Sequence, residues 1–155
     1  MIEALVAQLP ALQVVLPLIA APLCVILRRP TLAWLVFLIT AWGGLAISAL
    51  LIVVVKVGGP ISYAMGGWEP PLGIEYRVDH LNAFVIGVVS LIAAVIAPYA
   101  KASVEKEIDP ERIYLFYALM LLCLCGLLGI AMTGDAFNLF VFLEISSLSS
   151  YALIA

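Results

Sequence analysis

The sequence predicts an all-α integral membrane protein with five transmembrane helices and a short extramembrane β-hairpin between the second and third helices. Of the 155 residues, 66% are hydrophobic and 11% are charged, whereas soluble domains are about half apolar and a quarter charged. The Asp, Glu, Lys and Arg residues also cluster and leave long intervals, and about 20 helical residues suffice to cross ~30 Å of hydrocarbon. The intervals, each of 20 residues or more, are 4–27, 30–55, 80–100, 113–134 and 136–155, and the one acidic or basic residue within them is Glu144.

The first two intervals predict helices over about Pro10–Leu27 and Thr31–Val55. Pro10 suits a first helical turn, where its missing N–H leaves no hydrogen bond unmade. A secretory signal peptide is the alternative for the first interval. Such a peptide has basic residues before a shorter apolar core, whereas here Glu3 comes first and the basic pair Arg28 and Arg29 follows.

Residues 57–79 are expected to form the β-hairpin. In "IEYRVD" (74–79) apolar and charged side chains alternate strictly, which is typical of a strand with one buried face. The segment "ISYAM" (61–65) supplies the other strand, and "GGWEPPLG" (66–73) between them is rich in turn residues. The apolar face holds Ile74, Tyr76 and Val78, and the charged face holds Glu75, Arg77 and Asp79.

The last three helices are expected over about Asp79–Tyr99, Ile113–Met132 and from Ala136 onward, with residues 101–112 as a solvated loop. Asp79 and Asp135 each open a D-x-x-N motif, which predicts that their carboxylates cap helix N-termini. Collecting cations at the membrane surface is the functional alternative for both acids. The single histidine, His80, is expected at the surface or interface, with a proton shuttle as the alternative.

Lys and Arg in the loops predict the orientation of the chain, because such residues favour the cytoplasmic side. The two connections that share one side carry five basic residues, and the opposite side has Lys56 and Arg77. The five are Arg28, Arg29, Lys101, Lys106 and Arg112. The N-terminus is therefore predicted outside and the C-terminus in the cytoplasm.

The cysteines and the known cofactor motifs point to no redox or metal chemistry. Cys24, Cys123 and Cys125 all lie in predicted spans, and two helical residues two positions apart point about 200° away from each other. We therefore interpret them as small buried thiols and expect no metal site. No phosphate loop or nucleotide motif occurs, so no cofactor and no nucleic-acid partner is expected.

Glu144 is the candidate functional residue. It is the ninth residue from Ala136, which places it about 13 Å into the membrane at 1.5 Å per residue. An ionised side chain there costs about 2.5–3.5 kcal/mol on insertion scales. The protein can reduce this cost by keeping the acid protonated, by giving it a cationic partner, or by placing it on a water-filled path. Each of these couples Glu144 to protons or charge.

The helical neighbours of Glu144 fit such a role. Ser147 and Tyr151 follow at i+3 and i+7, so their hydroxyls share its face and can donate to a carboxylate. Phe137, Phe140 and Val141 cover the same side, while Ser146, Ser149 and Ser150 point elsewhere and favour close helix packing. The alternative is an acid held neutral by a hydrogen bond between helices.

Three segments together resemble a known membrane family. They are "LPALQVVLPLIAAPL", "GGWEPPLGIEYRVDHLNAF" and "LLGIAMTGDAFNLFVFLEISSLSSYALIA". The chain is similar to the proton-translocating antiporter-type subunits shared by Mrp-type Na⁺/H⁺ antiporters and respiratory complex I. The strongest likeness is to the D-type subunits of Mrp antiporters, in "TGDAFNLFVFLE" followed by "SLSSY".

The resemblance implies that Glu144 matches a key glutamate of the family, which pairs with a lysine on a later helix absent from this chain. It implies a bacterial inner-membrane protein, with other antiporter subunits, H⁺ and Na⁺ as partners. Residues 1–112 would be the leading three-helix segment, and 113–155 the first two helices of an incomplete five-helix repeat. Because Ala155 ends a helix without a cap, we expect an N-terminal fragment of a truncated antiporter-like subunit.

Three functions therefore stay open. The first is a subunit of a cation/proton antiporter in which Glu144 relays protons, which is a transporter rather than an enzyme. The second is a proton-pumping membrane subunit of NADH:quinone oxidoreductase. The third is a helical membrane scaffold without transport, for which replacing Glu144 with alanine changes nothing.

Overall fold

The computed structural model describes residues 6–68 and 73–155, and within them it confirms the predicted five-helix fold. The long helices are α2 (Leu9–Leu27), α3 (Pro30–Gly58), α4 (His80–Glu107), α5 (Ile113–Met132) and α6 (Ala136–Ile154). Each of these five is long and apolar enough to cross a membrane. The first four intervals without acidic or basic residues thus correspond to helices α2 to α5, and the last interval to α6.

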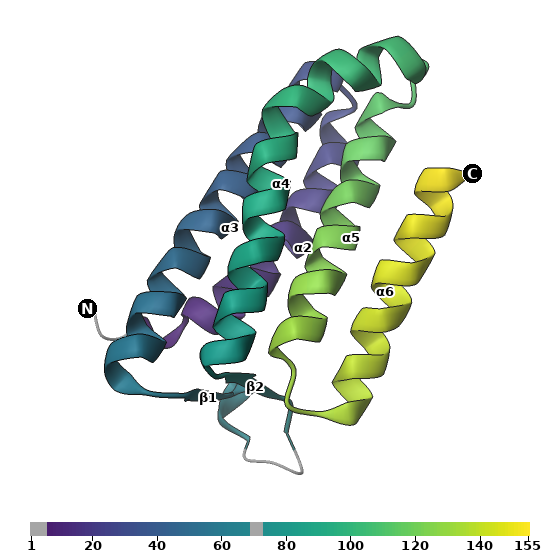
Figure 1. Ribbon diagram of the computed structural model, residues 1–155. Helices are drawn as coiled ribbons and strands as arrows, with labels where there is room; N and C mark the ends of the chain where they lie inside the picture. Colours follow the sequence, from purple (N-terminus) through teal and green to yellow (C-terminus); the bar gives the residue numbers. More distant parts are fainter. Residues whose placement is uncertain (1–5, 69–72) are drawn as a thin grey trace.

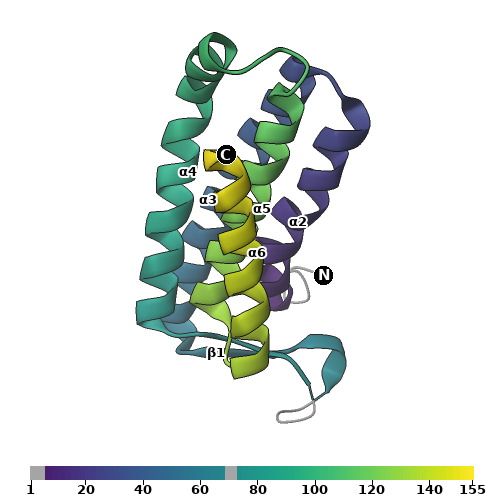
Figure 2. The same ribbon diagram turned by 90° about the vertical axis from the view of Figure 1, so that its right-hand side faces the viewer.

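Helices α2 to α5 form a four-helix bundle, and α6 lies outside it against α5 (Figures 1 and 2). In the bundle, α2 packs on α3 and α5, and α4 packs on the same two helices. One side of α6 therefore rests on α5, and the bundle leaves its other side open.

Two clusters of buried side chains hold the bundle together. One joins α2 to α5 near the α4–α5 connection, around Phe37, Tyr117 and Leu121. Here the rings of Phe37 and Tyr117 lie 5.6 Å apart. The other cluster lies near the hairpin and includes Ile86, Leu128 and residues of the hairpin itself. Because both clusters draw on helices distant in sequence, burial in them fixes how the helices pack.

The predicted β-hairpin is confirmed, with strands β1 (Ile61–Ala64) and β2 (Glu75–Val78) running antiparallel. Ile61 pairs with Val78 and Ala64 pairs with Glu75. Tyr76 and Val78 are buried, and Arg77 on the opposite face is exposed, as the alternation predicted. Residues 69–72 of the expected turn lie outside the described residues. We call this end of the bundle the hairpin end (Figure 1).

The prediction that the third helix ends near Tyr99 was wrong. Helix α4 continues to Glu107, so residues 101–107 of the expected loop are helical. A charged residue signals where a chain leaves hydrocarbon, but it does not stop a helix, and Lys, Glu and Ala are good helix formers. Ala100 and Val104 are also buried in this extension, and the Lys101 ammonium lies 4.8 Å from the centre of the Trp34 ring.

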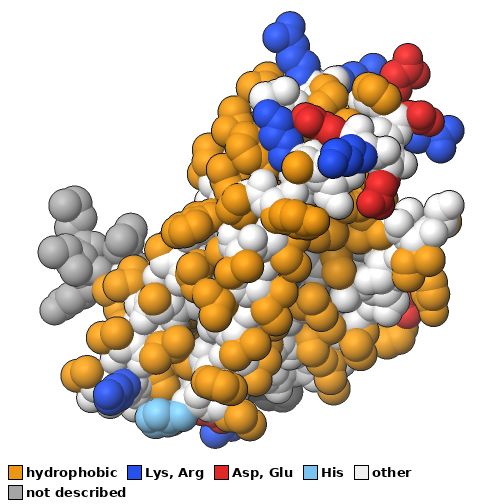
Figure 3. Space-filling model, turned by 45° about the horizontal axis from the view of Figure 1, so that its top comes forward, with side chains coloured by type: hydrophobic (Ala, Val, Ile, Leu, Met, Phe, Trp, Pro, Cys, Tyr) orange, Lys and Arg blue, Asp and Glu red, His pale blue; other side chains and the backbone are white. Residues whose placement is uncertain are grey.

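Charged side chains gather at the end of the bundle opposite the hairpin. Figure 3 shows blue and red groups there and a flank covered by orange hydrophobic side chains. The α2–α3 turn and the α4–α5 connection both lie at this end (Figure 1). The two basic connections thus share one side of the bundle, which is the arrangement that the orientation prediction requires.

Both predicted aspartate caps are formed. Asp79 accepts hydrogen bonds from the backbone N–H groups of Leu81 and Asn82, and Asp135 accepts from those of Phe137 and Asn138. Each carboxylate thereby satisfies N–H groups that have no partner within the helix.

Replacing Asp79 or Asp135 with alanine is expected to lower the free energy of unfolding by about 1 kcal/mol, whereas asparagine is expected to be nearly neutral because it caps equally well. Thermal melts of the full protein in detergent, followed by circular dichroism, measure this difference. If the asparagine variants melt as early as the alanine variants, the negative charge matters and capping alone is not the role of these acids.

Candidate functional site

Helix α6 carries the candidate acid, and two glycines of α5 decide how α6 packs. A Cβ atom added at Gly126 would lie 2.8 Å from the backbone nitrogen of Ser146 and 2.9 Å from the carbonyl oxygen of Phe142. One added at Gly129 would overlap the Phe142 ring. The two backbones thus approach closely where side chains are absent or small, as membrane helices commonly do.

The serines of α6 divide as predicted. Ser146 and Ser149 are buried against the bundle. The hydroxyl of Ser149 donates to the carbonyl of Ile145, and that of Ser150 donates to the carbonyl of Ser146. These hydroxyls find their acceptors within their own helix, so they need no hydrogen-bond partner on α5.

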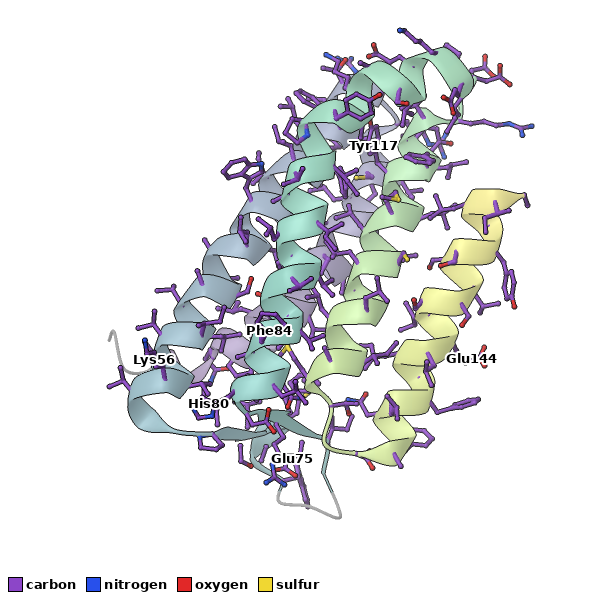
Figure 4. All side chains as sticks on the ribbon, viewed as in Figure 1. Lys56, Glu75, His80, Phe84, Tyr117 and Glu144 are labelled. Atoms are coloured by element: carbon purple, nitrogen blue, oxygen red, sulfur yellow. The ribbon has the colours of Figure 1, made fainter. Side chains whose placement is uncertain are left out.

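Glu144, Ser147 and Tyr151 lie on the opposite face of α6, which we call the acidic face. All three are exposed, and Figure 4 shows Glu144 on the side of α6 away from α5. The aromatic side chains beside them are exposed too, with Phe137 71% and Phe140 61% exposed. The sequence therefore placed the three residues on one face correctly, while the role of each stays a prediction.

Glu144 is the ninth of the 19 residues of α6, so it lies near the middle of the span. An ionised carboxylate facing lipid at that depth is unfavourable by about 2.5–3.5 kcal/mol or more. Phe140 and Val141 lie one turn before it and Leu148 one turn after it, and all three are exposed hydrophobic residues. The acidic face is thus an apolar surface with a carboxyl group at its centre.

The hairpin holds the start of α6 in place. Tyr76 of β2 forms an isolated β-bridge with Thr133, and the backbone N–H of Gly134 donates to the carbonyl of Glu75 at 2.9 Å. The Tyr76 ring also packs on Phe142 of α6, with ring centres 6.4 Å apart. The hairpin therefore joins the leading three helices to the helix that carries Glu144.

The buried Tyr76 stays neutral in this contact. Burial raises the pKa of its phenol above the usual value, and a side-chain hydrogen bond with Asn138 opposes that rise. A phenol whose pKa is about 10 when unperturbed is already uncharged at neutral pH. Tyr76 therefore packs against Phe142 without placing a charge at the start of α6.

Two asparagines at helix starts make further contacts around the end of α5, and the sequence did not reveal their role. They are the last residues of the two D-x-x-N motifs, Asn82 and Asn138. The Asn82 amide donates to the carbonyl of Ala131 at 2.6 Å, and the Asn138 amide donates to the hydroxyl of Thr133 at 3.1 Å. Asn82 thus ties the start of α4 to the last turn of α5, and Asn138 ties the start of α6 to the α5–α6 connection. The shared motif was a signal that the two asparagines have a common role, but it did not name their partners.

Cys123 and Cys125 point in different directions, as predicted. The Cys123 sulfur lies 3.4 Å from the hydroxyl of Ser150 on α6, and the Cys125 thiol points to the carbonyl of Val14 on α2. Among the described residues, no three His, Cys, Asp or Glu side chains are grouped closely enough to hold a metal ion.

The chain is similar in sequence to subunits of known membrane complexes. The chain is 43% identical over 153 residues to the N subunit of the NADH-quinone oxidoreductase of Desulforudis audaxviator, which covers 96% of the chain and 30% of that relative. It is 29% identical over 144 residues to the D subunit of the Na⁺/H⁺ antiporter of Bacillus subtilis, covering 92% of the chain and 29% of that relative. The chain is homologous to antiporter-type membrane subunits. No protein-family model matches it.

A solved structure supports the same relation. A chain of the Mrp complex from Dietzia sp. DQ12-45-1b superposes with a TM-score of 0.82 at 29% identity, covering 97% of this chain and 27% of that one. The chain thus spans about 30% of the length of its antiporter-type relatives. The expected antiporter-like membrane fold is thereby confirmed. The relatives that share it are subunits of larger membrane complexes.

Proposed function

We propose that this chain belongs to a subunit of a multisubunit monovalent cation (Na⁺)/H⁺ antiporter, and that Glu144 relays protons through the membrane. The observation that carries the proposal is a carboxyl group at the middle of an apolar helix, on a face that the bundle leaves open. Such an acid is costly in hydrocarbon, and intramembrane acids commonly mark proton or ion paths.

The surroundings of Glu144 suit a switching acid. Desolvation favours the protonated form of a carboxyl group, and a nearby cation favours the ionised form. A helix that brings a lysine to the acidic face and removes it again would make Glu144 release and regain a proton. Ser147 and Tyr151 supply hydroxyls on the same face, which are able to pass a proton or hold a water molecule beside the carboxyl group.

The same proposal includes the setting of the chain. We infer a bacterial inner-membrane location with the hairpin end outside, because the basic connections gather at the opposite end. Residues 1–112 are the leading segment, and residues 113–155 begin a five-helix repeat whose other helices cover the acidic face. Other antiporter subunits, H⁺ and Na⁺ are the partners, in a lipid bilayer.

A second candidate function is proton pumping within an NADH:quinone oxidoreductase. The 43% identity to the N subunit of such an enzyme favours it. In that complex the same acidic face would relay protons, and the redox reaction would occur in other subunits.

Proteoliposomes containing the complete complex distinguish the two candidates. An antiporter is expected to dissipate an imposed pH gradient when Na⁺ is added, without NADH or quinone. A respiratory complex is expected to build a pH gradient only while NADH reduces quinone. If neither condition moves protons, both candidates fail and the non-transporting scaffold is the remaining function.

A further inference from the structure

Helices α3 and α4 lie side by side on the flank of the bundle away from α6 (Figure 1), and the side chains between them leave a groove. At the hairpin end it opens as a cavity of about 330 Å³ between the end of α3 and the start of α4, where Lys56 and His80 line it. A second cavity of about 270 Å³ continues it along the helices to Leu45 and Leu91. The two share Ile52 and Phe84, so they form one groove.

The groove is polar at its mouth and apolar along its length. Lys56 lies in the last turn of α3, and His80 is the first residue of α4. Figure 4 shows both at the hairpin end, with Phe84 further along α4. Figure 3 shows the histidine beside a basic side chain at the edge of the hydrophobic surface. The mouth therefore offers one ammonium group and an imidazole, which both donate hydrogen bonds.

The neighbouring acid does not neutralise this mouth by pairing with Lys56. Asp79 precedes His80, but its carboxylate oxygen accepts from the N–H groups of Leu81 and Asn82, both at 2.9 Å. Lys56 is exposed on the groove side of α3. Among the described residues, the mouth thus has a cation available to an anionic group that enters from the membrane surface.

The depth of the groove matches one leaflet of a bilayer. Leu45 lies eleven positions before Lys56 on α3, and Leu91 lies eleven positions after His80 on α4, so the groove is about 16 Å deep. Half of a ~30 Å hydrocarbon core is about 15 Å. Gly87 keeps the path narrow but open, because a Cβ atom added there would lie 3.0 Å from the end of Ile52.

We propose that this groove is a binding site for a phospholipid with an anionic headgroup. The headgroup phosphate lies at Lys56 and His80, and one acyl chain follows the apolar wall past Phe84 and Gly87 to Leu91. Both the charge at the mouth and the depth of the apolar part fit a single lipid of that leaflet. The site is independent of the proposed proton relay, since it lies on the other side of the bundle from the acidic face.

Native mass spectrometry of the full protein in detergent tests this site, with dioleoyl phosphatidylglycerol and dioleoyl phosphatidylcholine titrated separately. The first lipid is expected to bind about five-fold more tightly, since one basic residue near a membrane surface contributes about that factor. The double variant Lys56→Gln/His80→Gln is expected to lose this preference. Gly87→Leu is expected to weaken both lipids by filling the groove.

Lys106→Gln is the matched control, because it removes one positive charge from the last turn of α4 at the opposite end. It is expected to leave the preference unchanged. Equal binding of the two lipids by the unmodified protein, or a preference that survives in the double variant, overturns the proposal. Displacement by soluble glycerol phosphate also overturns it, since the ligand would then be a free anion rather than a lipid.

Discussion

Proton flux in proteoliposomes is expected to fall about 100-fold or more when Glu144 is replaced with glutamine in the complete complex. Glutamine keeps the shape of the side chain and can still form hydrogen bonds, but it cannot release a proton at any working pH. A positioned proton-transfer group contributes about 10²–10⁴-fold to a rate, so its loss is a large effect. The measurement is the initial rate of pH change inside the vesicles, at equal amounts of assembled complex.

Two further variants show whether the effect belongs to the acid itself. Glu144→Asp retains a carboxyl group and is expected to keep part of the flux. Glu107→Gln removes an acid from the end of α4, outside the apolar span, and is expected to leave the flux unchanged. Full activity of Glu144→Gln would contradict the relay. The remaining role of Glu144 would then be structural, as a neutral acid held by a hydrogen bond between helices.

Attachment of α6 to the bundle is expected to be lost or strongly weakened in Gly126→Ala. The added Cβ atom meets backbone atoms of Ser146 and Phe142 at 2.8 and 2.9 Å, and a backbone cannot move aside as a flexible side chain does. Overpacking of this kind costs about 1–3 kcal/mol and sometimes more. The temperature at which the full protein aggregates in detergent measures the loss.

Gly58→Ala is the matched control for that substitution. Gly58 ends α3, and outside its chain neighbours and its own helix backbone no atom of the described residues lies within 4 Å of a Cβ added there. Because alanine is the better helix former, this variant is expected to match or slightly exceed the stability of the unmodified protein. Equal destabilisation by the two variants would show that the close approach of α5 and α6 is not what holds α6.

Most of the fold follows from where charges are absent. The limits of α5 were predicted to the residue, because charged residues bracket an apolar run on both sides. The end of α4 was missed, because leaving the membrane and leaving the helix are different events. Residues 101–107 carry charges that mark the end of the apolar span, yet they stay helical. They do so because they include good helix formers and because Val104 is buried.

The candidate site was predictable only in part. Helical periodicity suffices to place Glu144, Ser147 and Tyr151 on one face, because the spacing of residues fixes their direction. The attachment of α6 through Tyr76, Thr133 and Phe142 depends on which segments meet in space. The strand pattern and the capping motif mark the residues involved but do not identify their partners, so the contacts between the hairpin and the α5–α6 connection appear only in the structure.

The pairing of Tyr76 with Thr133 has a mechanical consequence for the acidic face. It anchors α6 at one end, so a tilt of this helix is a rotation about the hairpin end, and displacement grows along its length. Glu144 lies about 12 Å along the helix from Ala136, so a tilt of roughly 5° moves its backbone about 1 Å. Shifts of that size are enough to make or break a hydrogen bond, which means that a small pivot at the membrane surface is sufficient to change the partner of a carboxyl group in the bilayer interior.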